Sequence, residues 1–394
     1  MNININLFKM KITNILLSLL IICHAFFFQS CSSEDDQPIE NLELSQRKAT
    51  QFGINLFKCA EQASPNKNLI LSPFDAQLAL SMSANLLDAT YRNQVCHIFG
   101  YENISELNAA NKFLIKQLTS PITIFQDEPP ILTTKISNSV WSNVDIARKD
   151  KRSIAKHYFA DVKKCNLNSE EGVTDINNWM KSSGIRMSKP LIPDKTNFAI
   201  YTTLYFNQEW NYEYHFSESY RDIFHTLQGE KPIAFMKAAI NARYHCNEKH
   251  ESVILELSKF QMICILPVNT NLSETIKDFE ATDLYNIIDN ARIQDIKLYF
   301  PVFKLDKQLS LNSLLKKCKI DISNQNVTCE QASFIKVDQK GVAAGSITSL
   351  YCILSAPNVE DPIELKFNRP FMFFIVDPET KTLLFAGQCV GPVE

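Results

Sequence analysis

Residue types that bind metal ions gather in the segment 245–250, which reads His-Cys-Asn-Glu-Lys-His. A helical metal site needs two histidines on one face, as in H-E-x-x-H, and the spacing here is different. The segment lies between two strand-like runs, and its polarity is typical of a solvated turn. We therefore expect neither a metal site nor a cofactor.

Residue types that act as catalytic nucleophiles also occur, in incomplete patterns. The segments 45–48 and 313–316 both fit the S-x-x-K spacing of acyl-transferring serine enzymes, but the chain contains neither K-T-G nor S-D-N. Both segments have the apolar spacing of amphipathic helices, which accounts for them. Cys352 stands in an uncharged stretch without a histidine that could activate its thiol. G-x-S-x-G and a glycine-rich phosphate loop are also missing, so the sequence contains no complete catalytic motif of these kinds.

The uncharged stretch itself, residues 341–359, has the composition of a loop that can become a strand. It contains no charged side chain, and no proline before Pro357. Connections this long are usually functional or disordered, and disordered ones are usually charged or proline-rich. Small residues at 341–346 leave room for close backbone approach, and alternate residues from Val342 to Leu350 could be buried without desolvating a charge. The composition alone also fits an ordinary apolar strand in a hairpin.

The elements that would hold this segment follow from apolar spacing. Helical spacing predicts helices at 45–60, 73–86, 91–99, 105–118, 175–181 and 312–318. Strand-like runs are expected at 69–71, 135–141, 198–206, 252–257, 261–266, 296–303, 333–337, 364–367, 371–376 and 383–390. Because helices concentrate early and strands late, the pattern favours the α+β class.

The N-terminus has the features of a targeting segment. Two lysines precede an almost uncharged apolar stretch, Ile12–Phe28, and Cys31 then opens a run of serines and acids. This resembles a bacterial lipoprotein signal, with Cys31 as the lipidated first residue; an ordinary secretory signal is the alternative. We expect a signal peptide at 1–30, an acidic tether at 31–44 and a single domain at 45–394. The protein would be exported and lipid-anchored to the outer membrane or cell surface, or alternatively secreted.

The net charge bears on the binding partners, and the cysteine spacing bears on disulfide bonds. The chain has 40 basic and 43 acidic residues, and removal of 1–30 takes away two lysines, so the mature net charge is −5. That charge argues against a nucleic-acid partner. The eleven cysteines include no C-x-x-C, and several lie within apolar runs, so we expect buried free thiols in preference to a disulfide framework.

A family resemblance appears after the uncharged loop. The segment Lys366–Val376 resembles the signature that follows the reactive loop of serpins, the serine protease inhibitor family; its central residues are Phe367, Asn368, Arg369, Pro370 and Phe371. The segment 377–387 is similar to the family's last hairpin. Ser72 and Pro73 resemble the family's sheet-opening region, and Trp210 the turn at the upper end of the central sheet.

The resemblance covers most of the mature chain and implies a mechanism. It implies an α+β fold of three β-sheets and about eight or nine helices, with an exposed reactive-centre loop at about 339–362. A serine endopeptidase, or a cysteine one, would cleave this loop and form an acyl-enzyme. The N-terminal half of the loop would then insert into the central sheet, and the monomeric inhibitor would trap its target. The hinge of that loop would be Gly341, Val342, Ala343, Ala344, Gly345 and Ser346.

Departures from the family pattern bear on specificity. The segment 339–345 lacks the acids of the family hinge and is one residue short, and Asp75 and Cys318 stand where the family tends to have Ser and Gly. Counting from Gly341 predicts cleavage at Leu354-Ser355, with Ser355-Ala356 as second choice. Because the loop contains no Arg or Lys, the target would be elastase-, chymotrypsin- or papain-like and not trypsin-like. The alternative is a non-inhibitory serpin-like binding or structural protein that is cleaved as an ordinary substrate.

Overall fold

The computed structural model describes residues 42–123, 129–183, 192–193, 195–320, 326–343 and 361–392. The predicted signal peptide and Cys31 lie outside these residues. Among the helices described, none is long and apolar enough to span a bilayer.

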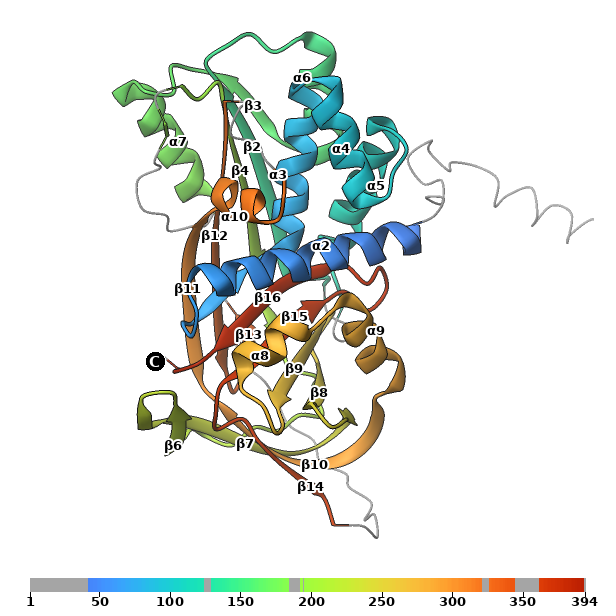
Figure 1. Cartoon of the computed structure of the whole chain (residues 1–394), viewed down its shortest axis with the longest axis vertical. Coiled ribbons are helices and arrows are strands. Elements are labelled where there is room, and N and C mark those ends of the chain that lie inside the picture. Colours follow the sequence, from blue (N-terminus) through green and yellow to red (C-terminus); the bar gives the residue numbers. More distant parts are fainter. Residues whose placement is uncertain are drawn as a thin grey trace, which may run out of the picture. The chain divides into compact units, whose positions relative to one another are not determined.

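Helices dominate the first part of the chain and return as short elements later (Figure 1). Those of the described residues are α2 (Leu42–Ala63), α3 (Pro73–Leu86), α4 (Ala89–Phe99), α5 (Ile104–Leu118), α6 (Arg148–Tyr158), α7 (Glu170–Ser182), α8 (Leu272–Asp278), α9 (Ala281–Asn290) and α10 (Leu311–Lys317). Helix α3 begins where Ser72-Pro73 predicted, because the Ser72 hydroxyl accepts a hydrogen bond from the Asp75 amide and proline fits the first turn.

The strands form two hydrogen-bonded networks. They are β1 (Leu69–Leu71), β2 (Thr134–Ser142), β3 (Asp161–Lys164), β4 (Phe198–Phe206), β5 (Gln208–Glu209), β6 (Tyr220–Thr226), β7 (Gly229–Cys246), β8 (His250–Glu256), β9 (Gln261–Pro267), β10 (Arg292–Pro301), β11 (Phe303–Ser310), β12 (Val327–Asp338), β13 (Gly341–Ala343), β14 (Ile363–Lys366), β15 (Phe371–Val376) and β16 (Leu383–Cys389). A seven-stranded sheet has the order β3-β2-β4-β12-β13-β5, with β11 on β12. The other nine strands have the order β1-β16-β15-β9-β8-β7-β10-β14, with β6 on β7.

The strand β7 explains why three expected sheets are joined into two networks. It is 18 residues long; its first part pairs with β6 and its last residues with β8, so it belongs to both halves of the nine-stranded network. Sequence reasoning missed this strand because its buried positions alternate with polar ones but include two alanines, Ala238 and Ala242, which give a weak signal.

Helix α6 was also missed, for a related reason. Eight of its eleven residues are charged or polar side chains such as Lys, Arg, Ser and His, and only Ile154 and Tyr158 are buried. Two buried positions one turn apart give too narrow an apolar stripe to predict a helix from spacing.

The seven-stranded sheet is covered on both faces (Figure 1). Successive residues of a strand point to opposite faces. From β4, Ala199 and Tyr201 pack with Ile176 and Trp179 of α7, whereas Thr202 contacts the start of α3. The helices α3 and α7 therefore lie on opposite sides of β4.

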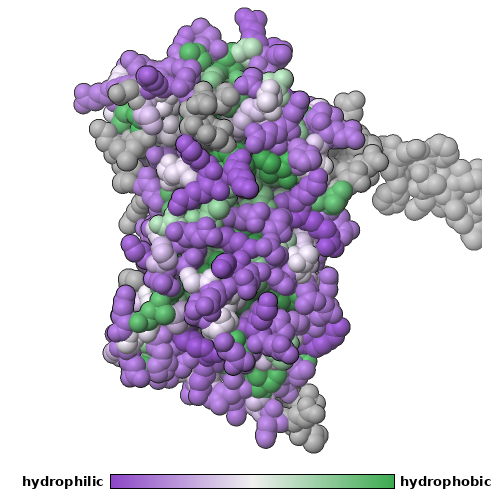
Figure 2. Space-filling view, viewed as in Figure 1, coloured by the Kyte–Doolittle hydropathy of each residue, from purple (hydrophilic) through white to green (hydrophobic). Residues whose placement is uncertain are grey.

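The signature residues at 367–371 belong to an aromatic core. The rings of Phe367 and Phe371 are fully buried and 5.2 Å apart, in an edge-to-face arrangement. Between them, the Asn368 carbonyl accepts a hydrogen bond from His225 at 2.7 Å, and Arg369 donates one to the Pro267 carbonyl at 3.1 Å. The signature therefore has a structural role in this chain. Figure 2 shows the opposite character outside: the face in view is mainly hydrophilic, with apolar side chains in small separate groups.

Candidate functional site

The start of the uncharged segment is a strand of the seven-stranded sheet. After β12 the chain turns back, and β13 pairs antiparallel with β12, Asp338 opposite Gly341 and Lys336 opposite Ala343. On its other side β13 pairs antiparallel with β5, which directly continues β4. The strand β13 therefore lies between β12 and the end of the β4–β5 segment.

Gly341 allows this close approach. Its φ is +154°, and a Cβ atom placed on it would lie 2.1 Å from the Gln208 carbonyl oxygen. Any other side chain would collide with the β5 backbone. Val342 follows and is fully buried, opposite Gln208. The requirement for glycine at 341 thus comes from backbone packing.

Trp210 holds the turn that leads into β13. Its indole N–H donates to the Asp338 carbonyl at 2.8 Å, and its backbone N–H to the Lys340 carbonyl at 3.2 Å. Its ring packs on Phe216 at 5.3 Å. These contacts join the chain after β5 to the turn between β12 and β13.

Farther along β12 the sheet is joined directly. Residues 327–331 of β12 pair parallel with residues 198–202 of β4, and the register ends at Gln331 opposite Thr202. The next four residues of β12, 332–335, pair with β11 on their other side; among the described residues they have no ladder partner toward β4. In one half of the sheet β12 and β4 therefore pair directly, and we call this the closed half. In the other half β13 lies between β12 and the β4–β5 segment.

The N-terminus of α3 lies at the point where the closed half ends. The Gln331 side chain accepts a hydrogen bond from the Ser72 N–H at 2.9 Å and donates one to the Ser72 carbonyl at 2.7 Å. The Thr202 hydroxyl donates to the Asp75 carbonyl at 3.3 Å. Helix α3 thus binds both strands at their last shared pair. We call these four residues, Ser72, Asp75, Thr202 and Gln331, the α3 clamp.

The Asp75 side chain is the unusual member of the clamp. The residue is 1% exposed, and within the described structure its Oδ1 atom has no hydrogen-bond partner. Burial raises the pKa of Asp75 from 3.8 to about 8, because the charged carboxylate is poorly solvated. The carboxyl is therefore protonated at neutral pH, and a neutral acid is tolerated beneath the sheet.

The other candidate residues are placed as follows. Ala343 is the last described residue of β13; Ala344, Gly345, Ser346, Leu354, Ser355 and Ala356 lie outside the described residues, so the bait bond stays a prediction. Sequence reasoning found Ser72 and Pro73 but missed Gln331 and Thr202. A buried glutamine in a strand run was the signal available, but its partner is 259 residues away.

The segment 245–250 forms the turn of the β7–β8 hairpin, as expected between two strands. It is less solvated than predicted, since His250 is 4% exposed. Burial, and the nearby His245, lower the pKa of His250. No metal-ligating cluster occurs among the described residues.

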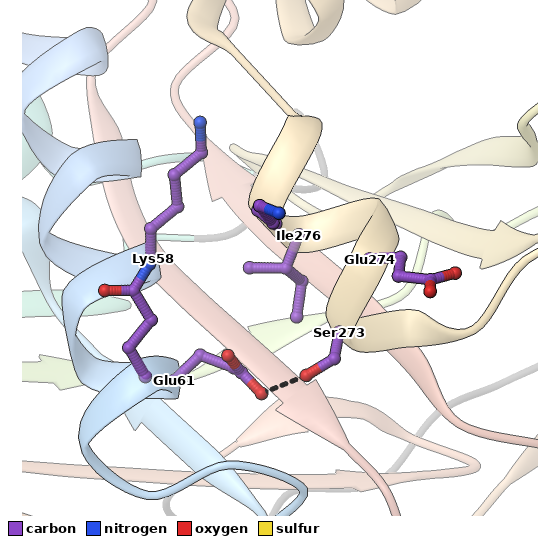
Figure 3. Close-up of a pocket in the computed structure, with 7 residues that line it drawn as sticks. Lys58, Glu61, Ser273, Glu274 and Ile276 are labelled. Carbon is purple, nitrogen blue, oxygen red and sulfur yellow. Dashed lines mark hydrogen bonds between the residues drawn. The ribbon is translucent and has the colours of Figure 1, made fainter.

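A shallow hollow of about 190 Å³ lies between α2 and α8 (Figure 3). Glu61 of α2 points toward Ser273 of α8, whose hydroxyl donates to it. Lys58 pairs with Glu280 at 2.5 Å, and this hydrogen bond lowers the pKa of Glu280. These polar groups satisfy one another, so they hold α8 and α9 against α2.

The comparisons with known proteins agree with this geometry. The family profile described as Serpin (serine protease inhibitor) matches residues 47–392. An uncharacterized serpin-like protein of Thermococcus kodakarensis is 26% identical over 86% of this chain and 84% of its own, and Iripin-3 of Ixodes ricinus is 22% identical over 92% and 96%.

Solved structures with the same fold include tengpin, a thermophilic serpin in the native state. It has a TM-score of 0.76 and 26% identity, and the match covers 91% of this chain and 96% of tengpin. Thyroxine-binding globulin in complex with thyroxine has a TM-score of 0.73 at 16% identity, covering 89% and 100%. The predicted α+β serpin fold is confirmed.

The first prediction concerns Gly341. We expect Gly341→Ala to displace β13 from its place beside β5, because the new Cβ collides with the Gln208 carbonyl. The expected loss of unfolding free energy is about 1–3 kcal/mol, measured by urea denaturation. Limited proteolysis should cut between 338 and 343 faster. Gly391→Ala is the matched control, since its Cβ would meet nothing closer than 3.7 Å. Equal behaviour of the two variants would contradict the assigned packing.

The second prediction concerns pH. Unfolding exposes Asp75 and returns its pKa to 3.8, so the unfolded chain releases this proton at a lower pH than the folded one. The contribution of Asp75 to stability is therefore complete below pH 3.8 and is lost between there and pH 8, at up to about 1.4 kcal/mol per pH unit. Urea midpoints measured from pH 4.5 to 8.5 should fall less steeply for Asp75→Asn. Parallel slopes in both proteins would overturn the assignment.

Proposed function

We propose that this chain, which belongs to the serpin (serine protease inhibitor) family, inhibits a serine endopeptidase by offering the loop after β13 as bait. The family is that of the serine protease inhibitors, and this chain is not an enzyme. One observation carries the proposal: β13 already lies between β12 and β5, so lengthening it inserts a strand between β12 and β4. Cysteine endopeptidases are the alternative target class.

The register of β13 supports this path. Toward β12 each step forward in β13 is one step back, from Asp338 opposite Gly341 to Lys336 opposite Ala343. If the same register continues beyond Ala343, residue 348 lies opposite Gln331 and residue 352 opposite Val327. Toward β4, the pairs of β13 and β5 place residue 348 opposite Thr202 and residue 352 opposite Phe198. On insertion, residue 348 would therefore lie between Gln331 and Thr202 and would separate these two residues of the α3 clamp.

The same register supports the predicted bait bond. Val327 and Phe198 are the first residues of β12 and β4 and are paired with each other. A strand from 341 to 352 would thus fill the sheet on both sides, leaving 353 and 354 just beyond it. We place cleavage at Leu354-Ser355, with Ser355-Ala356 as the second choice. A strand of this length spans about 40 Å, the distance over which the acylated protease would be carried.

The driving force would be backbone pairing. The inserted strand gains hydrogen bonds to both neighbours, whereas the closed sheet has only the five pairs of 327–331 with 198–202. Side chains at 344, 346, 348, 350 and 352 would share the face of Val342, and none is charged. Burial of this face therefore requires no charge desolvation.

A second candidate is a non-inhibitory serpin-like binding or structural protein. The hinge favours it to some extent, since Gln339 and Lys340 stand where acids are expected. The thyroxine complex of thyroxine-binding globulin has the same fold and carries a small ligand. In this case a protease would cut the loop as an ordinary substrate and would remain active afterwards.

The proposed function also includes a location and a class of target. Export, with a lipid anchor on Cys31, would place the monomer on the outer membrane or cell surface, or release it if the signal is an ordinary secretory one. Because residues 341–359 contain no Arg or Lys, the target would be elastase-, chymotrypsin- or papain-like. The net acidic chain would have no nucleic-acid partner.

The test is incubation with a protease panel, followed by a denaturing gel. We expect a covalent complex with an elastase- or chymotrypsin-like enzyme, and a released fragment that begins at Ser355. Clean cleavage, with the protease still active, would support the binding-protein alternative and contradict trapping.

Two arginine variants provide a matched control for insertion. Ser346→Arg places a charge on the face that would be buried against α3, so it should be cleaved at a similar rate but form at least tenfold less covalent complex. Gly345→Arg points to the other face, where the flanking side chains of Tyr205 and Phe334 are only half-buried, and should retain more of the complex. If both variants trap equally well, insertion in this register is wrong.

A further inference from the structure

Two thiols far apart in the sequence meet at the contact of α2 with α10. Cys59 lies on α2 and Cys318 directly follows α10, and they are 259 residues apart. Their Sγ atoms are 2.9 Å apart, closer than two sulfur atoms that merely pack. Both residues are half-buried, so a small oxidant can reach them. Neither thiol lies on the loop or on the two strands between which it would insert.

Only a small movement separates the two thiols from a covalent bond. A disulfide bond is about 2.0 Å long, so the sulfurs must approach by less than 1 Å. Cys318 is the C-terminal cap of a seven-residue helix, and Lys319 after it has φ +62°. The sulfur of Cys318 also lies 3.7 Å from the Asn55 carbonyl, one turn before Cys59 on α2. Both contacts direct the Cys318 side chain onto α2.

We propose that Cys59 and Cys318 form a reversible disulfide that fixes α10 to α2. The two thiols lose two protons and two electrons, and the oxidant is a disulfide compound, which accepts the electrons and is reduced to two thiols. In the first step one cysteine thiolate attacks the oxidant, forms a mixed disulfide and expels one thiolate. In the second step the other cysteine attacks the mixed disulfide, closes the Cys59–Cys318 bond and expels the second.

Accessibility separates this pair from the other thiols. Burial, and then the neighbouring Cys59 thiol, raise the pKa of Cys318, so oxidation of the pair should be faster at higher pH, where more thiolate is present. Either sulfur can attack the oxidant first, and the other then closes the bond. The buried thiols of the described residues, Cys96, Cys264, Cys329 and Cys389, are closed to an oxidant, since each is at most 1% exposed.

The disulfide would also restrain the N-terminal end of β12. From α10, the Asn312 side chain donates to the Val327 carbonyl at 2.6 Å and accepts from the Cys329 N–H at 2.8 Å. Fixing α10 to α2 therefore fixes the first residues of β12. Because the bond closes a loop of 259 residues, it also restricts the unfolded chain strongly. This inference holds whether or not the protein traps a protease.

The experiment uses the full chain, first reduced and then treated with oxidised glutathione. Remaining thiols are alkylated in denaturant, and the peptides are mapped by mass spectrometry without reduction. We expect a cross-linked peptide pair that contains Cys59 and Cys318, no alkylation at either residue, and a thermal midpoint higher by about 5 °C. Dithiothreitol should reverse all three changes.

Variants separate this pair from general oxidation. In Cys318→Ser the cross-link should vanish and Cys59 should remain as a mixed disulfide with glutathione. Cys246→Ser removes an exposed thiol and should leave the cross-link and the midpoint shift unchanged. The proposal is overturned if the wild-type chain carries glutathione on both Cys59 and Cys318 without a cross-link, or if both cysteines remain reduced. Since these two outcomes are read on the wild-type chain, they do not depend on folding of the variants.

Discussion

The two hydrogen bonds between the Gln331 side chain and the Ser72 backbone are the constraint on which the state of the central sheet depends. They join β12 to the start of α3 at the last residue that β12 pairs directly with β4. Thr202, the β4 partner of Gln331, is bound to the same helix end through the Asp75 carbonyl. While these contacts persist, β4 and β12 stay together. A new strand can pass this point only by replacing them.

At the opposite end of the sheet, β13 already lies between β12 and β5, and the proposed strand would extend it. Gly341 brings β13 against β5 where a side chain would collide, and Trp210 binds the turn before it. The sheet therefore has a closed half, where β12 pairs with β4, and a half where β13 lies between β12 and β5. Extending the pairing of β13 with β12 and its pairing with β5 gives the same last residue for an inserted strand, 352. In the proposed insertion, the new strand would pair with both neighbours where β12 and β4 now pair only at 327–331 and 198–202.

Much of this arrangement follows from the sequence. Ser72-Pro73 predicts the start of α3, the runs at 198–206 and 371–376 coincide with β4 and β15, and the glycine at 341 indicates close backbone approach. The family signature predicts the fold, which the family match confirms. Local patterns carry this information because caps and apolar periodicity depend on near neighbours.

The rest depends on contacts between distant residues. Gln331 matters because it meets Ser72, and Cys318 because it meets Cys59; each pair is 259 residues apart, and spacing along one chain cannot reveal it. Asp75 was noticed as a departure from the family's serine, but its raised pKa follows only from full burial. The long strand β7 was missed because its apolar alternation is weak.

Thermal unfolding before and after cleavage of the loop tests the central claim most directly. The full chain is cut near Leu354 by a chymotrypsin-like enzyme that is then inactivated, and both forms are melted under the same conditions. If the segment after Gly341 inserts between β4 and β12, the cleaved protein unfolds at a much higher temperature than the intact one. An unchanged or lower midpoint would show that the sheet stays closed at Gln331 and Thr202, and would contradict the account.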